Sequence, residues 1–91
     1  MVEVIVTIGN ELGLHARPAA LFVQRANKYK SEIFLRKDDM EVNGKSIMSV
    51  MMLAAESGTE IIIRAVGEDE DAAIYDLREL IESKFGEDRG D

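Results

Sequence analysis

The sequence predicts an α+β fold in which helices cover one face of a four-stranded, largely antiparallel sheet. Segments with the two-residue hydrophobic period of strands alternate with segments that have the helical period, in the order β-α-β-β-α-β-α. The 91 residues suffice for one hydrophobic core, and they contain no internal repeat, linker or low-complexity segment. Helices packed on one face of such a sheet bury their own apolar stripes and one face of each strand. We therefore expect a single domain over residues 1–91.

The first half of the chain is predicted to form a strand, a helix and a hairpin. Alternation over residues 2–8 indicates a strand whose buried face is formed by Val2, Val4, Val6 and Ile8. From Ala16 to about Lys28 one stripe of an amphipathic helix is formed by Ala19, Phe22, Val23 and Ala26. Residues 32–37 and 40–42 have the composition of two strands joined by a tight turn, so they should pair with each other.

The second half is predicted to form a short helix followed by a central strand. Ser46 is a suitable N-cap for a helix that runs from Ile47 to about Ala55. In that helix Val50 and Leu53 are expected to face the core. Residues 59–66 are the segment richest in β-branched residues, which favours a central strand.

A last helix and a polar tail complete the predicted fold. Four carboxylates at 68–71 fall at the start of this helix, where the helix dipole favours negative charge. Its buried stripe is formed by Ile74, Leu77, Ile81 and Phe85. The tail over 86–91 contains no apolar anchor, and we expect it to be frayed.

Composition excludes several classes of function. The 18 acidic and 11 basic residues give a net charge of −7, which argues against nucleic acid and anionic membranes as partners. The absence of cysteine excludes disulfides and thiol chemistry, and no Walker loop or cluster of metal ligands is present, so no cofactor is expected. The apolar runs are too short to cross a membrane, and no basic segment followed by an apolar one opens the chain. A cytoplasmic protein without membrane insertion is therefore expected.

The segment 13–20 is predicted to carry the chemistry. It holds the only histidine, His15, and the only proline, Pro18. Proline is tolerated in the first helical turn, so His15 should lie just before a helix N-terminus, where unpaired N–H groups and the dipole favour an anion. Arg17 adds a guanidinium that can bind two phosphate oxygens. A lone histidine is more often a surface or capping residue, but here a nucleophile, an anion site and a counter-charge fall together.

Two runs resemble one protein family. The run GLHARPAA, residues 13–20, resembles the active-site loop of the HPr family, the histidine-containing phosphocarrier proteins of the bacterial phosphotransferase system. The run NGKSIMSVM, residues 43–51, resembles the regulatory-serine segment of that family. Length and element order also fit, so the resemblance covers Val2 to about Phe85. It implies an open-faced β-sandwich with three helices on one face, acting as a monomer.

The resemblance also implies roles for individual residues. In the family a ring nitrogen of the histidine accepts a phosphoryl group from enzyme I and passes it to the enzyme IIA components of sugar permeases. His15 and Arg17 match those roles, which would make the protein a carrier and not a free-standing enzyme. Ser46 matches the serine that a dedicated kinase phosphorylates. Further partners would then be an HPr kinase/phosphorylase and a catabolite-control transcription factor.

The short helix after Ser46 has more apolar residues than one buried stripe can hold. Spacing places Ile47, Met48 and Met51 on a neighbouring face, and flexible methionines suit a surface that docks several partners. The resemblance implies that enzyme I and its acceptors dock there, with Ala20 standing where many relatives have threonine. Protein partners are compatible with this acidity if basic residues of the chain cluster where the partner docks. The candidates for such a basic patch are Arg17, Arg25, Lys28, Lys45 and Arg64.

Two other functions remain open at this point. A regulatory binding protein could act as a corepressor in its Ser46-phosphorylated form and dispense with His15, so the presence of His15 favours the carrier without excluding the second role. A small ligand-binding or RNA-binding α+β domain is disfavoured by the acidity and by the lack of aromatic pairs on the strands.

Overall fold

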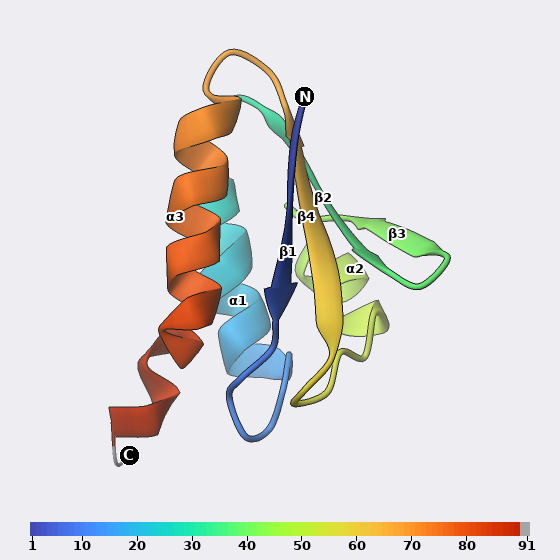
Figure 1. Cartoon of the computed structure of the whole chain (residues 1–91), viewed down its shortest axis with the longest axis vertical. Coiled ribbons are helices and arrows are strands. Elements are labelled where there is room, and N and C mark those ends of the chain that lie inside the picture. The colour runs from blue at the N-terminus through green and yellow to red at the C-terminus, as the bar shows by residue number, and fades with distance from the viewer. Residues whose placement is uncertain (90–91) are drawn as a thin grey trace.

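A computed structural model describes residues 1–89, and its elements follow the predicted order. They are β1 (Val2–Thr7), α1 (Ala16–Ala26), β2 (Glu32–Lys37), β3 (Met40–Asn43), α2 (Ile47–Met52), β4 (Glu60–Val66), α3 (Glu70–Glu82) and a 3-10 helix, η1 (Lys84–Arg89). Figure 1 shows α1 and α3 side by side against one side of the sheet. The predicted α+β fold, a four-stranded antiparallel sheet with three α-helices, is confirmed.

The sheet has the strand order β1-β4-β2-β3, and every neighbouring pair is antiparallel. β4 lies between β1 and β2, as its β-branched composition predicts. The predicted hairpin of β2 and β3 is confirmed, with Lys37 opposite Met40 at the turn. Because β1 and β2 both flank β4, α1 must cross β4 to connect them. The chain therefore enters α1 at one end of the sheet and leaves it at the other.

The core lies between the helices and one face of the sheet. Alternate residues of the central strands are buried there, as in Ile61, Ile63 and Ala65 of β4. The predicted helical stripes are buried too; they comprise Ala19, Phe22, Val23 and Ala26 of α1 with Ile74, Leu77 and Ile81 of α3. The opposite face of the sheet has no helix over it, and Ile5 is 64% exposed there.

The prediction that the second helix reaches Ala55 is wrong, since α2 ends at Met52. The next two amide groups bond three residues back, Leu53 N to Val50 O and Ala54 N to Met51 O, and Ala54 has a φ of 51°. A left-handed residue stops an α-helix. The Lys37 ammonium then binds the Leu53 carbonyl at 3.1 Å, so one of the last carbonyls of the helix is satisfied by β2 instead of a further turn.

The C-terminal segment differs from the prediction in its secondary structure. Phe85 is buried as expected, but it belongs to η1 and not to the last α-helix. Lys84 and Phe85 both have positive φ, which ends the α-helical path after Glu82. The sequence predicts a frayed tail over 86–91, whereas η1 extends to Arg89, and residues 90–91 lie outside the described residues.

Candidate functional site

His15 is the N-cap of α1. Its backbone is extended, with φ −87° and ψ −169°, and its carbonyl accepts a hydrogen bond from Ala19 N at 2.9 Å. Its side chain is half-buried and makes no capping hydrogen bond to the helix. Pro18 lies in the first turn, as the sequence predicts, and the structure buries it. The ring therefore stands beside a helix end whose first N–H groups have no intrahelical acceptor.

Arg17 is the second residue of α1, and its side chain is exposed. A guanidinium at this position lies within the first turn, where the positive end of the helix dipole already favours an anion. The guanidinium charge and the helix dipole both attract an anion. An anionic group carried by His15 would therefore meet backbone dipoles and a full positive charge from the same helical turn.

The loop before His15 is tied to the segment that follows α2. Leu14 is buried, and its N–H donates to the carbonyl of Ala55 at 2.9 Å. Gly13 has a φ of +72°, and a Cβ at this position would lie 2.5 Å from the same carbonyl oxygen. Only glycine permits both the left-handed backbone and this close approach. The loop is thus held against the polypeptide that leaves α2.

Ser46 is the N-cap of α2, and this prediction is confirmed. Its hydroxyl oxygen accepts a hydrogen bond from Ser49 N at 3.3 Å. The preceding turn is closed by Asn43, whose side-chain oxygen accepts from Lys45 N at 2.9 Å. An added phosphate would stand at the N-terminus of this helix.

α1 and α2 contact each other and run in opposite directions. At one end, Asn27 after α1 donates to the carbonyl of Lys45, and the Lys45 ammonium donates to the carbonyl of Tyr29 at 2.6 Å. At the other end, Leu14 before α1 bonds Ala55 after α2. His15 and Ser46 therefore lie at opposite ends of this helix pair, and the structure does not bring them together.

The exposed side of α2 lies between those two ends. Ile47, Met48, Met51 and Met52 are 43%, 77%, 41% and 62% exposed, and we call these four residues the α2 patch. Val50 and Leu53 are buried, as predicted, and Ala20 on α1 is half-buried. Two exposed apolar residues were not predicted for this surface: Met52 on α2, and Leu12, which is 72% exposed on the loop before His15. The excess of apolar residues on a short helix was the available signal for Met52.

The predicted basic patch is wrong for two of its residues. Arg25 forms an ion pair with Asp76 of α3, which also accepts a hydrogen bond from Tyr29. Arg64 points to the open face of the sheet, where it pairs with Glu41 at 2.8 Å and stacks over the ring of Phe34. Strand alternation puts Arg64 on that face because its neighbours Ile63 and Ala65 point into the core.

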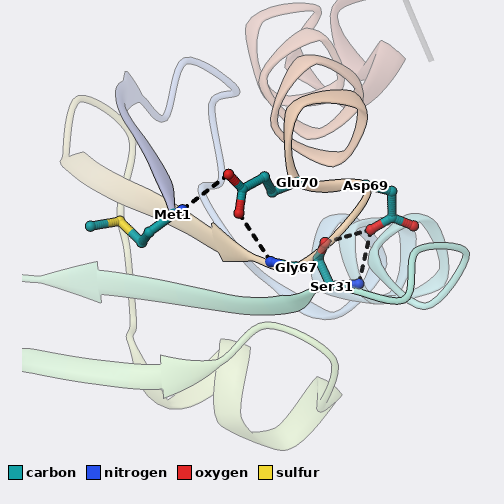
Figure 2. A network of polar contacts seen from close by, with 5 residues as sticks. All are labelled: Met1, Ser31, Gly67, Asp69 and Glu70. Atoms are coloured by element: carbon teal, nitrogen blue, oxygen red, sulfur yellow. Dashed lines mark hydrogen bonds and ion pairs between the residues drawn. The ribbon is translucent and has the colours of Figure 1, made fainter.

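The acidic start of α3 forms a separate polar network at the far end of the molecule (Figure 2). Asp69 accepts hydrogen bonds from Ser31 N at 2.9 Å and from the Ser31 hydroxyl. The Ser31 hydroxyl, with the N–H of Lys30, lowers the pKa of Asp69 to about 2. Glu70 accepts from Gly67 N and pairs with the N-terminal ammonium, both at 3.0 Å. These carboxylates fix the N-terminus and the loops at Ser31 and Gly67 to the start of α3.

Neither a metal centre nor a membrane span is found in the part of the chain that the structure describes. Over residues 1–86, whose side chains are described, no three histidine or acidic side chains are grouped so that they could hold a metal ion. None of the helices in that range has both the length and the apolar character needed to cross a bilayer.

Comparison with known proteins identifies the family. Residues 2–83 match the family model described as the PTS HPr component phosphorylation site. The chain belongs to the HPr family. The resemblance expected from residues 13–20 and 43–51 is thereby confirmed, and with it a general role as a phosphocarrier of the phosphotransferase system.

Three relatives illustrate the similarity. The phosphocarrier protein HPr of Xylella fastidiosa (strain Temecula1) is 50% identical over 88 residues, which are 97% of this chain and 99% of the relative. The HPr-like protein Crh of Bacillus subtilis is 48% identical over 84 residues, 92% of this chain and 99% of the relative. The structure of HPr-C-His from Thermoanaerobacter tengcongensis is 53% identical, with a TM-score of 0.92 and coverage of 94% of this chain and 97% of its own.

Two of these relatives have also been solved as dimers. The HPr dimer from Thermoanaerobacter tengcongensis matches with a TM-score of 0.76. Crh of Bacillus subtilis was crystallised as a dimer with a swapped domain and matches with a TM-score of 0.75. Members of this fold can therefore assemble as pairs, which the monomer expected from the sequence does not anticipate.

Proposed function

We propose that this protein accepts a phosphoryl group on His15 from phosphorylated enzyme I and passes it to enzyme IIA components of sugar permeases. The observation that carries the proposal is the position of His15 as the N-cap of α1 in a member of the HPr family. The only imidazole of the chain stands where backbone dipoles and Arg17 can bind a phosphate.

The transfer is an in-line exchange between two imidazoles. A ring nitrogen of His15 forms a bond to phosphorus while the bond from phosphorus to the donor's histidine nitrogen breaks, and the donor ring leaves in its neutral form. Positioning and charge neutralisation supply most of the rate enhancement in such reactions. The N–H groups at the start of α1 and the guanidinium of Arg17 would share the charge on the phosphoryl oxygens.

Partners would dock on the α2 patch and on Ala20, between the loop of His15 and the helix cap at Ser46. Apolar side chains that are 41% to 77% exposed on one short helix support this assignment. Since each partner needs the same surface in turn, we propose that the working form is a cytoplasmic monomer.

Ser46 would regulate the carrier. A phosphate on its hydroxyl would place nearly two negative charges beside Ile47 and Met48, at the edge of the α2 patch. An HPr kinase/phosphorylase would add and remove it. A second candidate function is that of a corepressor for a catabolite-control transcription factor, and the 48% identity to Crh, described as a catabolite repression HPr, favours it.

The decisive experiment is incubation with phosphoenolpyruvate and enzyme I, followed by intact-mass analysis. We expect one added phosphoryl group that is lost in acid, retained in base, and absent from His15→Ala. Equal labelling of His15→Ala would show that the acceptor is another residue. A protein that enzyme I does not label, but that binds a transcription factor once Ser46 is phosphorylated, would be the corepressor and not the carrier.

A further inference from the structure

Asn10 is an unusual residue for its position. Only two polar residues in the described part of the chain are buried, Asn10 at 0% exposure and Ser31 at 1%. A buried amide is costly unless its hydrogen-bonding groups have partners, so such a residue usually fixes something. Asn10 stands between the end of β1 and His15, in the loop that the proposed reaction uses.

The side chain of Asn10 binds the carbonyl that His15 also binds. Its amide nitrogen Nδ2 donates to Gly13 O at 2.6 Å, and the backbone N–H of His15 donates to the same oxygen at 2.9 Å. In return, Gly13 N donates to the backbone carbonyl of Asn10 at 3.1 Å. Asn10 therefore binds the peptide groups on both sides of Gly13: its carbonyl binds Gly13 N, and its side chain binds Gly13 O. Gly13 O is also bound by His15 N.

Two further hydrogen bonds restrict the backbone on either side of His15. The next N–H, that of Leu14, donates to Ala55 O, and the His15 carbonyl accepts from Ala19 N. Gly13 cannot move toward Ala55, because the two backbones are already in close contact. If the Asn10 amide were removed, Gly13 O would lose the shorter of its two hydrogen bonds, and the Gly13–Leu14 peptide would keep only its bonds to Ala55 O and His15 N. The position of the His15 Cα atom relative to the start of α1 would then be less tightly fixed.

We infer that Asn10 is a positioning residue for His15, which holds the imidazole in line for phosphoryl transfer through the shared carbonyl of Gly13. The inference rests on the proposed function. Since Asn10 is fully buried, it cannot touch enzyme I, so its removal should change the transfer step and not the docking step.

Ser31→Ala is the matched control for Asn10→Ala. Both variants remove one buried polar side chain and its hydrogen bond, but Ser31 precedes β2 and bonds Asp69 at the opposite end of the fold (Figures 1 and 2). The two variants should therefore have comparably lowered melting temperatures. Steady-state transfer from phosphorylated enzyme I would be measured for both, and for the parent, well below all three melting temperatures.

Asn10→Ala is expected to lower kcat by about tenfold or more, with KM for the carrier changed less than about twofold. Ser31→Ala should leave both constants within about twofold of the parent. Hydrogen exchange gives a second readout: the His15 amide should exchange faster in Asn10→Ala and not in Ser31→Ala. If Asn10→Ala fails to fold, Asn10→Ser, whose hydroxyl is too short to reach Gly13 O, should show the same loss in kcat.

The inference alone would be overturned by a folded Asn10 variant with parental kcat, or by equal losses of kcat in Asn10→Ala and Ser31→Ala. A rise in KM at unchanged kcat would also overturn it, since that would mean a role in docking. If enzyme I does not label His15 of the parent, the proposed function itself is wrong, and the inference is wrong with it.

Discussion

His15 and Ser46 occupy equivalent backbone positions, each the N-cap of a helix, but they use their side chains differently. The hydroxyl of Ser46 accepts a hydrogen bond from Ser49 N and so caps α2. His15 caps α1 through its backbone only, and its ring makes no capping bond. The first arrangement suits a residue whose modification changes a surface. The second suits a residue whose side chain reacts.

Arg17 should matter for transfer and little for folding. Arg17→Ala is expected to slow phosphorylation of His15 far more than Arg17→Lys, because lysine keeps the charge but loses the two-pronged contact. The free energy of unfolding of both variants should lie within about 0.5 kcal/mol of the parent's, because Arg17 is exposed and exposed substitutions usually change it little. Rapid-quench transfer assays and thermal melts measure the two effects. Normal transfer together with a large loss of stability would mean that Arg17 is structural.

Ser46→Asp should act as a partial mimic of the phosphate. Unfavourable docking of only about 1.4 kcal/mol lowers affinity tenfold, so loading of His15 by enzyme I should slow by about that factor. The melting temperature should not fall, because the new charge lies at the N-terminus of α2. Ser46→Ala should transfer almost normally and lose about 1 kcal/mol of capping stability.

Ser57→Asp, at an exposed serine outside the α2 patch, controls for charge alone. If it slows loading as much as Ser46→Asp does, the effect comes from net charge. A Ser46→Asp protein that melts early, or that loads at the parental rate, leaves Ser46 with its capping role only.

Among the secondary-structure elements, α2 is a six-residue helix that side chains hold at both ends, one from its own N-cap and one from β2. Ser46 caps its start, and the Lys37 ammonium of β2 binds the Leu53 carbonyl at its end. Val50 and Leu53 attach it to the core. Such a short helix is not stable by itself, so these contacts are what keep the α2 patch in one conformation.

Met48→Asp and Met51→Asp should weaken enzyme I binding by about tenfold or more, since the core of an interface tolerates a buried charge poorly. The fold should be unaffected, because both side chains are exposed. Met40→Asp is the matched control: Met40 is also exposed, at 40%, but lies on β3 outside the patch. Affinities can be measured by NMR titration. Unchanged affinity in both patch variants would show that partners dock elsewhere.

The N-terminus of α3 predicts a pH dependence of stability. Hydrogen bonding lowers the pKa of Asp69 from 3.8 to about 2 in the folded state, so the folded state favours the ionised form. This contribution is complete above pH about 4 and is lost as the pH falls through about 2. Asp69→Asn should therefore melt below the parent at pH 7, and the difference should shrink between pH 4 and pH 2.

Asp71→Asn, an exposed carboxylate on the same helix, should show no such convergence. A constant gap between the parent and Asp69→Asn across this pH range would mean that Asp69 acts through packing and not through its charge.

Across the chain, the sequence predicted most strands and helix starts correctly, because hydrophobic periodicity and capping residues act between residues close in the sequence. Strand alternation predicted the buried face of β1, β-branched composition predicted the central place of β4, and Ser46 and Pro18 marked two helix starts. The end of α2 was missed because it depends on Lys37, a residue far away in the sequence.

The arrangement of the site was harder to predict than its residues. Motif and spacing suffice to single out His15, Arg17 and Ser46. That His15 and Ser46 lie at opposite ends of an antiparallel helix pair follows from tertiary contacts such as Lys45 to Tyr29, which no local pattern encodes. The ion pairs of Arg25 and Arg64 depend on tertiary packing in the same way, and the predicted basic patch failed there.

The central claim is that the protein receives a phosphoryl group at His15 and gives it up again. A chase experiment tests this most directly: the protein is labelled from radioactive phosphoenolpyruvate through enzyme I, freed of enzyme I, and mixed with an enzyme IIA domain. We predict that the acid-labile label leaves this protein and appears on enzyme IIA, and that His15→Ala carries no label at any stage. Label that stays on the protein in the presence of enzyme IIA, or that enters without His15, would contradict the claim.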